Sequence, residues 1–267
     1  MLSARQLVAS HDVLFVTLDT LRYDVAAREL AAGRTPNIAR RLPRGAWEER
    51  HSPGSFTYAA HHAFFAGFLP TPAKPGRHPR LFAARFAGSE TSTDETLVLD
   101  SADIVTGFAA LGFRTICVGG VGFFNKRNAL GSVLPGLFQE SHWDESLGVT
   151  APSSTHNQVS LAIERVRAAG EGQRVFLFVN VSALHQPNRH YVPGAMSDSI
   201  ETHAAALRYV DREIERLFAF FEARGPTLCV LCSDHGTAYG EDGYEGHRLA
   251  HPVVWTVPYA EFVLGER

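Results

Sequence analysis

Three features that define whole classes of protein are scarce or absent in this sequence of 267 residues. Cysteine occurs only at Cys117, Cys229 and Cys232, an odd set within apolar stretches, so we expect core thiols rather than a disulfide framework. No apolar run reaches the 18 residues that a membrane-spanning helix needs. Charge is also nearly balanced, with 25 Lys and Arg against 28 Asp and Glu, and supplies no basic field for nucleic acid. Nucleic-acid and membrane partners are therefore not expected.

The N-terminal segment lacks the features of a secretory leader. Residues 1–10 lead directly into an apolar run, without a charged segment, a long apolar segment and a small-residue cleavage site in that order. Cys229 and Cys232 have CxxC spacing, but they lie in an expected strand, which does not favour a redox or zinc-knuckle motif. These observations predict a cytoplasmic protein.

Four apolar runs predict buried strands, at residues 13–18, 114–121, 175–181 and 227–231. They are continuous rather than alternating, as parallel strands covered on both faces are. Helical periodicity predicts helices over residues 157–168 and 202–224 between them. This order predicts an α/β fold with a doubly wound, mainly parallel sheet flanked by helices. Residues 70–80 are proline-rich and predict a loop, and because no linker divides the chain, residues 1–267 are interpreted as a single domain.

Polar side chains follow three of the predicted strands. Asp19 follows the first strand, His185 the third, and Asp234 and His235 the fourth, while His247 comes after a glycine-rich loop. In such sheets the functional residues gather beyond the carboxyl ends of the strands. Mixed carboxylate and imidazole ligands suit Zn²⁺ or Mn²⁺ better than Ca²⁺. Each residue alone could be a helix cap or turn former, but together they predict a divalent metal site.

A candidate nucleophile stands at the start of an apolar helix. Residues 51–67 run from a turn into a helix that ends at Gly67, with Thr57 at its expected N-cap. Backbone N–H groups at a helix start attract anionic esters, and a bound metal can activate a hydroxyl placed there. A simpler interpretation, in which Thr57 is only the cap of this helix, stays open on these residues.

Together, these segments resemble the alkaline phosphatase superfamily, in particular its sulfatase-like hydrolase branch. Residues 16–24 (VTLDTLRYD) are similar to the opening strand of that branch, and residues 35–38 (TPNI) to the segment after its first helix. Residues 57–67 match its nucleophile helix, where the nucleophile stands ten positions before a closing glycine. Residues 228–236, which end in Ser-Asp-His-Gly, and the pairs at 246–247 and 257–258 match its last core segments. The matches span residues 12–262 and imply an alkaline phosphatase-like core.

The resemblance also implies a role for each candidate residue. One metal site would comprise four side chains: Asp19, Thr57, Asp234 and His235. Thr57 would be the covalent nucleophile. His185 and His247 would bind a second metal or the nonbridging oxygens of the ester. His61 would contact the anion, and Asn125 and Lys126, after the second strand, would be oxyanion contacts. The implied cofactor is a divalent cation, with Zn²⁺ favoured and Mn²⁺ or Ca²⁺ as alternatives.

The sequence departs from this branch in three places. Formylglycine sulfatases carry Cys or Ser in a Cys/Ser-x-Pro-x-Arg motif, whereas residues 57–61 read TYAAH, so that class is excluded. The Asp that two-metal phosphodiesterases place shortly before the third-strand His is missing, and one metal site is therefore expected. The C-terminal subdomain of full-length sulfatases is also expected to be absent.

The expected function is that of a metal-dependent hydrolase of phosphate or sulfate esters, or of a phospho-group transferase, acting on a small anionic ester through Thr57. The alternative is a degenerate member of the branch that serves as a binding or assembly module. It is motivated by Ala59 and Ala60 in the nucleophile motif and by the missing Asp before His185. A haloacid-dehalogenase-type phosphatase is disfavoured, because Leu21 stands where that chemistry needs a second acidic residue.

Overall fold

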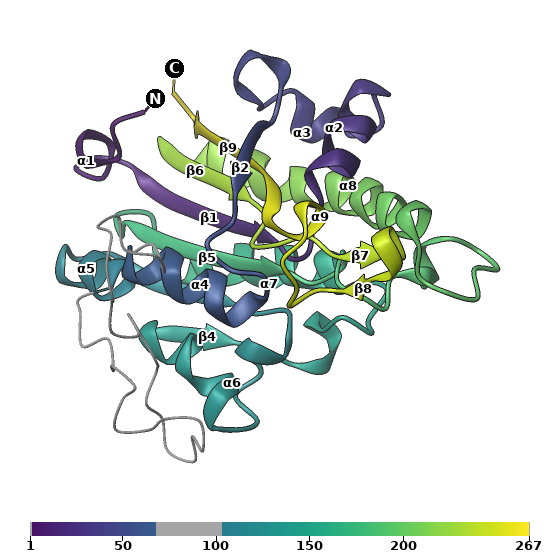
Figure 1. Ribbon diagram of the computed structural model, residues 1–267. Helices are drawn as coiled ribbons and strands as arrows, with labels where there is room; N and C mark the ends of the chain where they lie inside the picture. Colours follow the sequence, from purple (N-terminus) through teal and green to yellow (C-terminus); the bar gives the residue numbers. More distant parts are fainter. Residues whose placement is uncertain (1, 68–102, 267) are drawn as a thin grey trace, which may run out of the picture.

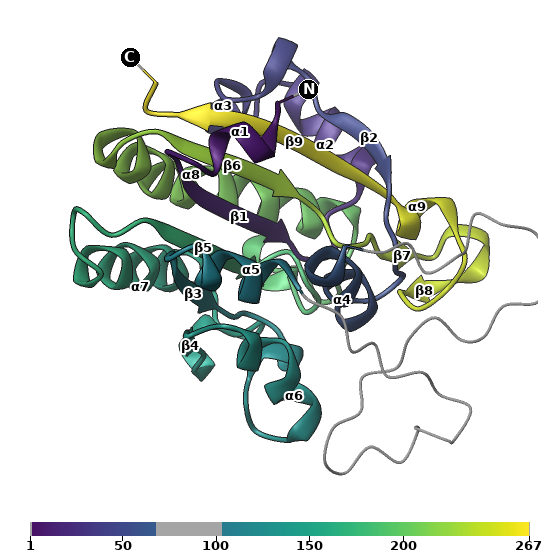
Figure 2. The same ribbon diagram turned by 90° about the vertical axis from the view of Figure 1, so that its left-hand side faces the viewer.

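The computed structural model describes residues 2–67 and 103–266, in which one sheet of seven strands is covered by helices on both faces (Figures 1 and 2). The strand order is β2-β9-β6-β1-β5-β3-β4. In chain order the strands are β1 (Asp12–Leu18), β2 (Glu48–His51), β3 (Arg114–Val118), β4 (Glu140–His142), β5 (Val175–Val181), β6 (Thr227–Cys232) and β9 (Thr256–Leu264). Pairing is parallel from β6 through to β4, and antiparallel where β9 meets β6 and β2. The predicted fold class is confirmed.

Two apolar layers hold the helices against the sheet. One layer packs α2 (Tyr23–Ala31), α3 (Pro36–Ala39), α7 (Ser154–Ala168) and α8 (Ile200–Arg224) against Leu14, Val16 and Leu18 of β1. The other packs α4 (Thr57–Ala66) and α5 (Ile104–Ala110), which lie in front of the sheet in Figure 2, against Val13 and Phe15. Because alternate residues of a strand point to opposite faces, a strand buried on both sides has a continuous apolar sequence.

Smaller elements complete the described chain. Short helices are α1 (Ala4–Leu7), α6 (Ala129–Val133) and α9 (Pro252–Trp255), and the hairpin β7 (Ala238–Tyr239) and β8 (Glu245–Gly246) forms a separate two-stranded sheet. Among the described helices, none combines the length and the apolar character that crossing a membrane requires. The loop predicted at residues 70–80 lies outside the described residues, and the single-domain interpretation stays a prediction.

The predicted strands and helices are present, with differences at their ends. The strand predicted at residues 114–121 ends at Val118, because Gly119 and Gly120 pass close to neighbouring segments. A Cβ atom on Gly120 would lie 2.3 Å from the carbonyl oxygen of Asn180, so only glycine fits there. Helix α8 begins before residue 202, at Ile200, because Ser199 forms a capping box with the third residue of the helix.

The strand register brings the ends of three strands together. Leu18 of β1 lies opposite Val181 of β5, and Thr17 of β1 lies opposite Cys232 of β6. The residues that follow these strands therefore share one edge of the sheet, as the sequence pattern predicts. Helix α4 begins beside the same edge (Figure 1), and this places Thr57 near the ends of the strands.

Candidate metal centre

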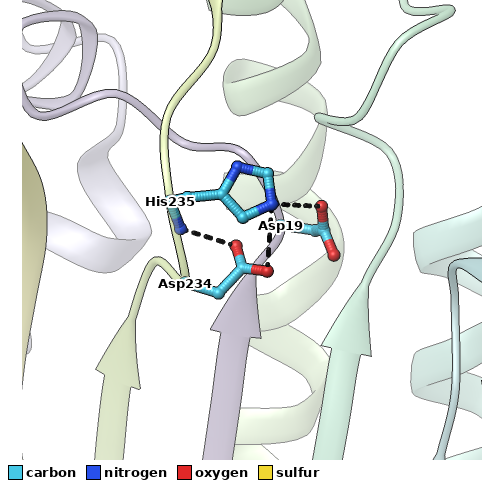
Figure 3. A group of neighbouring side chains, drawn as sticks. All are labelled: Asp19, Asp234 and His235. Carbon is cyan, nitrogen blue, oxygen red and sulfur yellow. Dashed lines mark hydrogen bonds and ion pairs between the residues drawn. The ribbon is translucent and has the colours of Figure 1, made fainter. Parts of the chain in front are cut away.

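Three buried side chains converge beyond the ends of β1 and β6 (Figure 3). Asp19 follows β1 directly, and Asp234 and His235 follow β6 after one intervening residue. One ligand atom from each lies within 4.8 Å of the others, and none of the three side chains is exposed to solvent. His235 Nε2 lies 3.5 Å from Asp234 Oδ2 and 4.0 Å from Asp19 Oδ1. The arrangement matches the spacing of ligands around a single ion.

Neighbouring groups determine which atoms these residues present to one another. His235 Nδ1 faces the Gly236 carbonyl oxygen at 2.8 Å and must donate to it, so that the lone pair of Nε2 faces the carboxylates. Asp234 Oδ1 accepts from the backbone N–H groups of Thr20 and His235. Within the described residues, Asp234 Oδ2 and Asp19 Oδ1 are buried without a hydrogen-bond partner. Two unpaired carboxylate oxygens and one imidazole lone pair fit a divalent cation.

The electrostatics of this cluster also favour a cation. Burial and the nearby Asp234 carboxylate raise the pKa of Asp19 from its ordinary value of 3.8 to about 6. Burial raises the pKa of Asp234 from 3.8 to about 7. The pKa of His235 is lowered by burial, which favours the neutral imidazole that metal binding requires. A divalent cation would compensate the negative charge of the two carboxylates, whose ionised form is otherwise disfavoured by burial.

These raised pKa values predict how the metal-free protein responds to pH. Both carboxyls bind protons more tightly in the folded chain than in the unfolded one, so the stability they contribute is fully present below about pH 4 and is lost as the pH rises through about 6 to 7. Between pH 5 and 8, we expect the Tm of the metal-free wild type to fall by about 5 °C relative to that of metal-free Asp234→Asn. Calorimetry of the two metal-free proteins would measure this difference, and the metal-loaded wild type should show no such fall. A rise in the Tm of the metal-free wild type relative to that of Asp234→Asn would contradict the prediction.

Thr57 lies directly beside the three residues. Its hydroxyl oxygen is 3.4 Å from Asp19 Oδ2 and 3.3 Å from His235 Nε2. Thr57 is the first residue of α4, and Phe56 is the N-cap, where no side chain caps the helix. The expected N-cap position of Thr57 and its interpretation as only a helix cap are therefore wrong, because its side chain contacts Asp19 and His235 and caps no backbone group.

A cavity of about 380 Å³ opens above this hydroxyl. The cavity is lined by twelve residues: Thr57, Val121, Gly122, Phe123, Asn125, Asn128, Leu130, Gly131, Val149, His185, His247 and Arg248. The His247 ring centre lies 4.6 Å from that of His235 and 5.5 Å from that of His185. His185 Nδ1 donates to the Gln186 carbonyl oxygen, which leaves its Nε2 lone pair available. Burial lowers the pKa of His247 to about 3, so its imidazole is neutral.

The structure does not bring two of the candidate residues to this cavity. His61 lies on the buried side of α4, where its Nε2 lies 2.9 Å from the Thr17 hydroxyl and its Nδ1 lies 2.7 Å from the Thr57 carbonyl oxygen. Lys126 is directed elsewhere, since its ammonium donates to the carbonyl oxygen of Ser141 at 2.6 Å. Neither His61 nor Lys126 lines this cavity, because His61 is buried against the core and the Lys126 ammonium is directed to Ser141. Their expected roles as anion contacts stay predictions.

Two residues at the site were missed by the sequence analysis. Asn180 donates to Asp19 Oδ2 at 2.9 Å from the interior of β5. Its signal was the one strongly polar side chain in an otherwise apolar strand. Arg248 follows His247, lines the cavity and lies over the ring of Phe56 at 5.6 Å. No periodicity marks Arg248, whose position depends on the fold of the loop before α9.

Comparison with known proteins identifies the family. A family model described as Sulfatase matches residues 11–259. The chain belongs to the sulfatase family. Its sequence matches none of the curated proteins with which it was compared. The predicted superfamily is confirmed, and solved structures from the alkaline phosphatase superfamily share the fold.

Three of these structures show how far the likeness extends. The zinc complex of the C-terminal periplasmic domain of EptC from Escherichia coli is 11% identical, with a TM-score of 0.66 over 96% of this sulfatase-family chain and 74% of that chain. The lipoteichoic acid synthase LtaP from Listeria monocytogenes is 10% identical, with a TM-score of 0.66 over 100% and 70% of the two chains. A protein of the alkaline phosphatase superfamily from Vibrio parahaemolyticus is 15% identical, with a TM-score of 0.58 over 95% and 60%.

The comparisons correct the predicted location of this sulfatase-family chain. Several of the similar structures are C-terminal periplasmic domains of EptC, from Escherichia coli and from Campylobacter jejuni. The prediction of a cytoplasmic protein is contradicted, because these neighbours are periplasmic domains. The sequence argument failed because buried free thiols such as Cys117 and Cys229 reflect packing and do not report the redox compartment.

Proposed function

We propose that this chain is a metal-dependent enzyme that transfers a phospho group from a small anionic ester to Thr57, and from there to water or to a second acceptor. The observation that carries the proposal is the position of the Thr57 hydroxyl, 3.4 Å from Asp19 Oδ2 and 3.3 Å from His235 Nε2 at the floor of the cavity. A hydroxyl so placed lies within reach both of a bound ion and of an ester in the cavity.

The proposed cofactor is one divalent cation held by Asp19, Asp234 and His235. Zinc is favoured because the donors are two carboxylate oxygens and an imidazole nitrogen, and because one similar structure is a zinc complex. The proposed substrate is a phosphate ester, since three of the similar structures are phosphoethanolamine transferases or their domains. The absence of nucleic-acid and membrane partners stays a prediction.

In the proposed reaction, Thr57 attacks the ester in line with the leaving group. A divalent cation bound beside Thr57 would lower the pKa of the hydroxyl and offset negative charge on the ester. Thr57 Oγ1 forms a bond to phosphorus as its proton passes to water in the cavity. The bond from phosphorus to the leaving oxygen breaks, and this oxygen keeps the electron pair and takes a proton from water. Water or an acceptor hydroxyl then attacks phosphorus and loses its proton. The bond from phosphorus to Thr57 Oγ1 breaks, and Oγ1 takes a proton from water.

Three side chains on the cavity wall would hold the ester. Arg248 supplies a positive charge, and His185 and His247 are placed to contact the nonbridging oxygens of the phospho group. Phe123 and Leu130 also line the cavity and suit an apolar leaving group. The cavity thus offers basic side chains for the phospho group and apolar side chains for its substituent.

A panel of aryl esters tests this function. Zinc- and manganese-loaded protein would be assayed with p-nitrophenyl phosphate, bis-p-nitrophenyl phosphate and p-nitrophenyl sulfate, with chelator-treated protein as the blank. We expect metal-dependent release of nitrophenol from at least one phosphate ester and slower release from the sulfate ester. No release from any ester by protein that holds its metal would refute the proposed function and favour the degenerate binding module.

A further inference from the structure

Asn180 lies beneath the metal cluster, and its side chain is fully buried. Its amide nitrogen is 2.9 Å from Asp19 Oδ2 and 3.3 Å from the Thr17 hydroxyl oxygen. Its amide oxygen is 3.0 Å from the backbone nitrogen of Val121. One side chain therefore connects a metal-ligand candidate on β1 with the segment that follows β3.

The backbone of Val121 determines how the Asn180 amide is oriented. A backbone N–H can only donate, so the amide oxygen must face Val121 and the NH₂ group must face Asp19 and Thr17. The close approach at Gly120, where a Cβ would meet the Asn180 carbonyl oxygen at 2.3 Å, holds this segment against β5. The donor that faces Asp19 is thus set by backbone packing.

The hydrogen bonds continue from Asn180 through Thr17 to His61, and a backbone group also determines how His61 is protonated. His61 Nδ1 faces the Thr57 carbonyl oxygen at 2.7 Å and must carry a proton to donate to it. In the neutral ring, Nε2 then accepts from the Thr17 hydroxyl at 2.9 Å. With its proton directed to His61, Thr17 turns a lone pair to Asn180. In each hydrogen bond that connects His61, Thr17, Asn180 and Asp19, only one of the two partners can therefore be the donor.

We propose that Asn180 is a positioning residue of the metal centre, which holds Oδ2 of Asp19 so that Oδ1 is the oxygen presented to the cation. The inference rests on the proposed function for the identity of the site. It agrees with the contacts of Asp19. Oδ2 accepts from Asn180 and also faces the Thr57 hydroxyl, whereas Oδ1 has no hydrogen-bond partner within the described residues. A neutral amide orients the carboxylate without supplying a competing positive charge.

The test compares two substitutions with the same chemistry at different places. Asn180→Asp replaces the donor to Asp19 with an oxygen but keeps an acceptor for Val121. Asn37→Asp makes the same change in α3, where the Asn37 amide donates to the carboxylate of Asp211 at 3.0 Å. Co²⁺ alone would be titrated into each metal-free protein and followed by its visible absorption, with the Tm measured in parallel.

We expect Asn180→Asp to weaken Co²⁺ binding by about 10- to 100-fold and to change the visible spectrum of bound Co²⁺, because the coordinating oxygen is no longer held. Asn37→Asp should lower the Tm while leaving affinity and spectrum at their wild-type values. Wild-type affinity and spectrum in Asn180→Asp, or an equal loss of affinity in Asn37→Asp, would overturn the inference.

A milder variant keeps the test decisive if Asn180→Asp does not fold. Thr17→Val removes the hydroxyl that lies between His61 and Asn180, and it is expected to weaken Co²⁺ binding several-fold; unchanged binding would overturn the inference. The outcome is independent of turnover. Loss of Co²⁺ affinity in a protein that hydrolyses no ester would uphold the positioning role and refute the proposed function alone.

Discussion

Replacing Thr57 with alanine is expected to lower turnover of any phosphate ester by at least about 10³-fold. The substitution removes the hydroxyl that contacts the side chains of both Asp19 and His235, and with it the atom that would attack phosphorus. Alanine is compatible with the first turn of a helix, and Thr57 caps no backbone group through its side chain. Steady-state assays and thermal unfolding of the same preparation would separate lost chemistry from lost folding.

Two further variants control this experiment. Thr57→Ser retains a hydroxyl and is expected to keep measurable activity. Thr155→Ala removes a fully buried threonine from the first turn of α7, away from the cavity, and is expected to leave turnover near the wild-type rate. Turnover by Thr57→Ala at the wild-type rate would end the proposed mechanism.

The second large effect is expected from Asp234→Asn, which should lower metal-dependent turnover at least about 100-fold. Asparagine has nearly the size of aspartate, and its amide oxygen can still accept from the backbone N–H groups of Thr20 and His235. The change removes the negative charge of Asp234 Oδ2, a buried atom without a hydrogen-bond partner in the described part of the chain. Assays after chelation and refilling with zinc would measure the loss.

A second buried carboxylate provides the matched control. Asp211 on α8 accepts from the backbone N–H of Ile38 at 2.8 Å and is nearly inaccessible to solvent, as Asp234 is. Asp211→Asn makes the same chemical change away from the cavity and should leave turnover intact. Full activity in Asp234→Asn, or an equal loss in Asp211→Asn, would remove the reason to place the metal at this edge.

Much of the fold could be predicted because burial on both faces leaves a clear sequence pattern. β1 and β5 are buried along their whole length and read as unbroken apolar runs. The exposed edge strand β2 consists of charged residues and gives no such signal. The antiparallel strand β9 alternates between buried and partly exposed positions, and its pairing with β6 depends on contacts between distant segments.

The part of the candidate site that follows directly from the ends of the strands could be predicted from the sequence. Asp19, Asp234 and His235 follow β1 and β6, and adjacent parallel strands bring them together. The direction of His61 could not be predicted in the same way. Helix α4 is buried on several sides, so its sequence has no polar face that would show which way a histidine points. The role of Asn180 could not be predicted either, because it depends on the hydrogen bond from its amide to Asp19, which only the structure shows.

The most direct test of the metal centre is elemental analysis of the purified wild type beside Asp234→Asn and Asp211→Asn. We expect about one equivalent of zinc or manganese in the wild type and in Asp211→Asn, and almost none in Asp234→Asn. Wild-type protein that holds no divalent metal even after reconstitution, or an Asp234→Asn variant that holds as much as the wild type, would contradict this expectation.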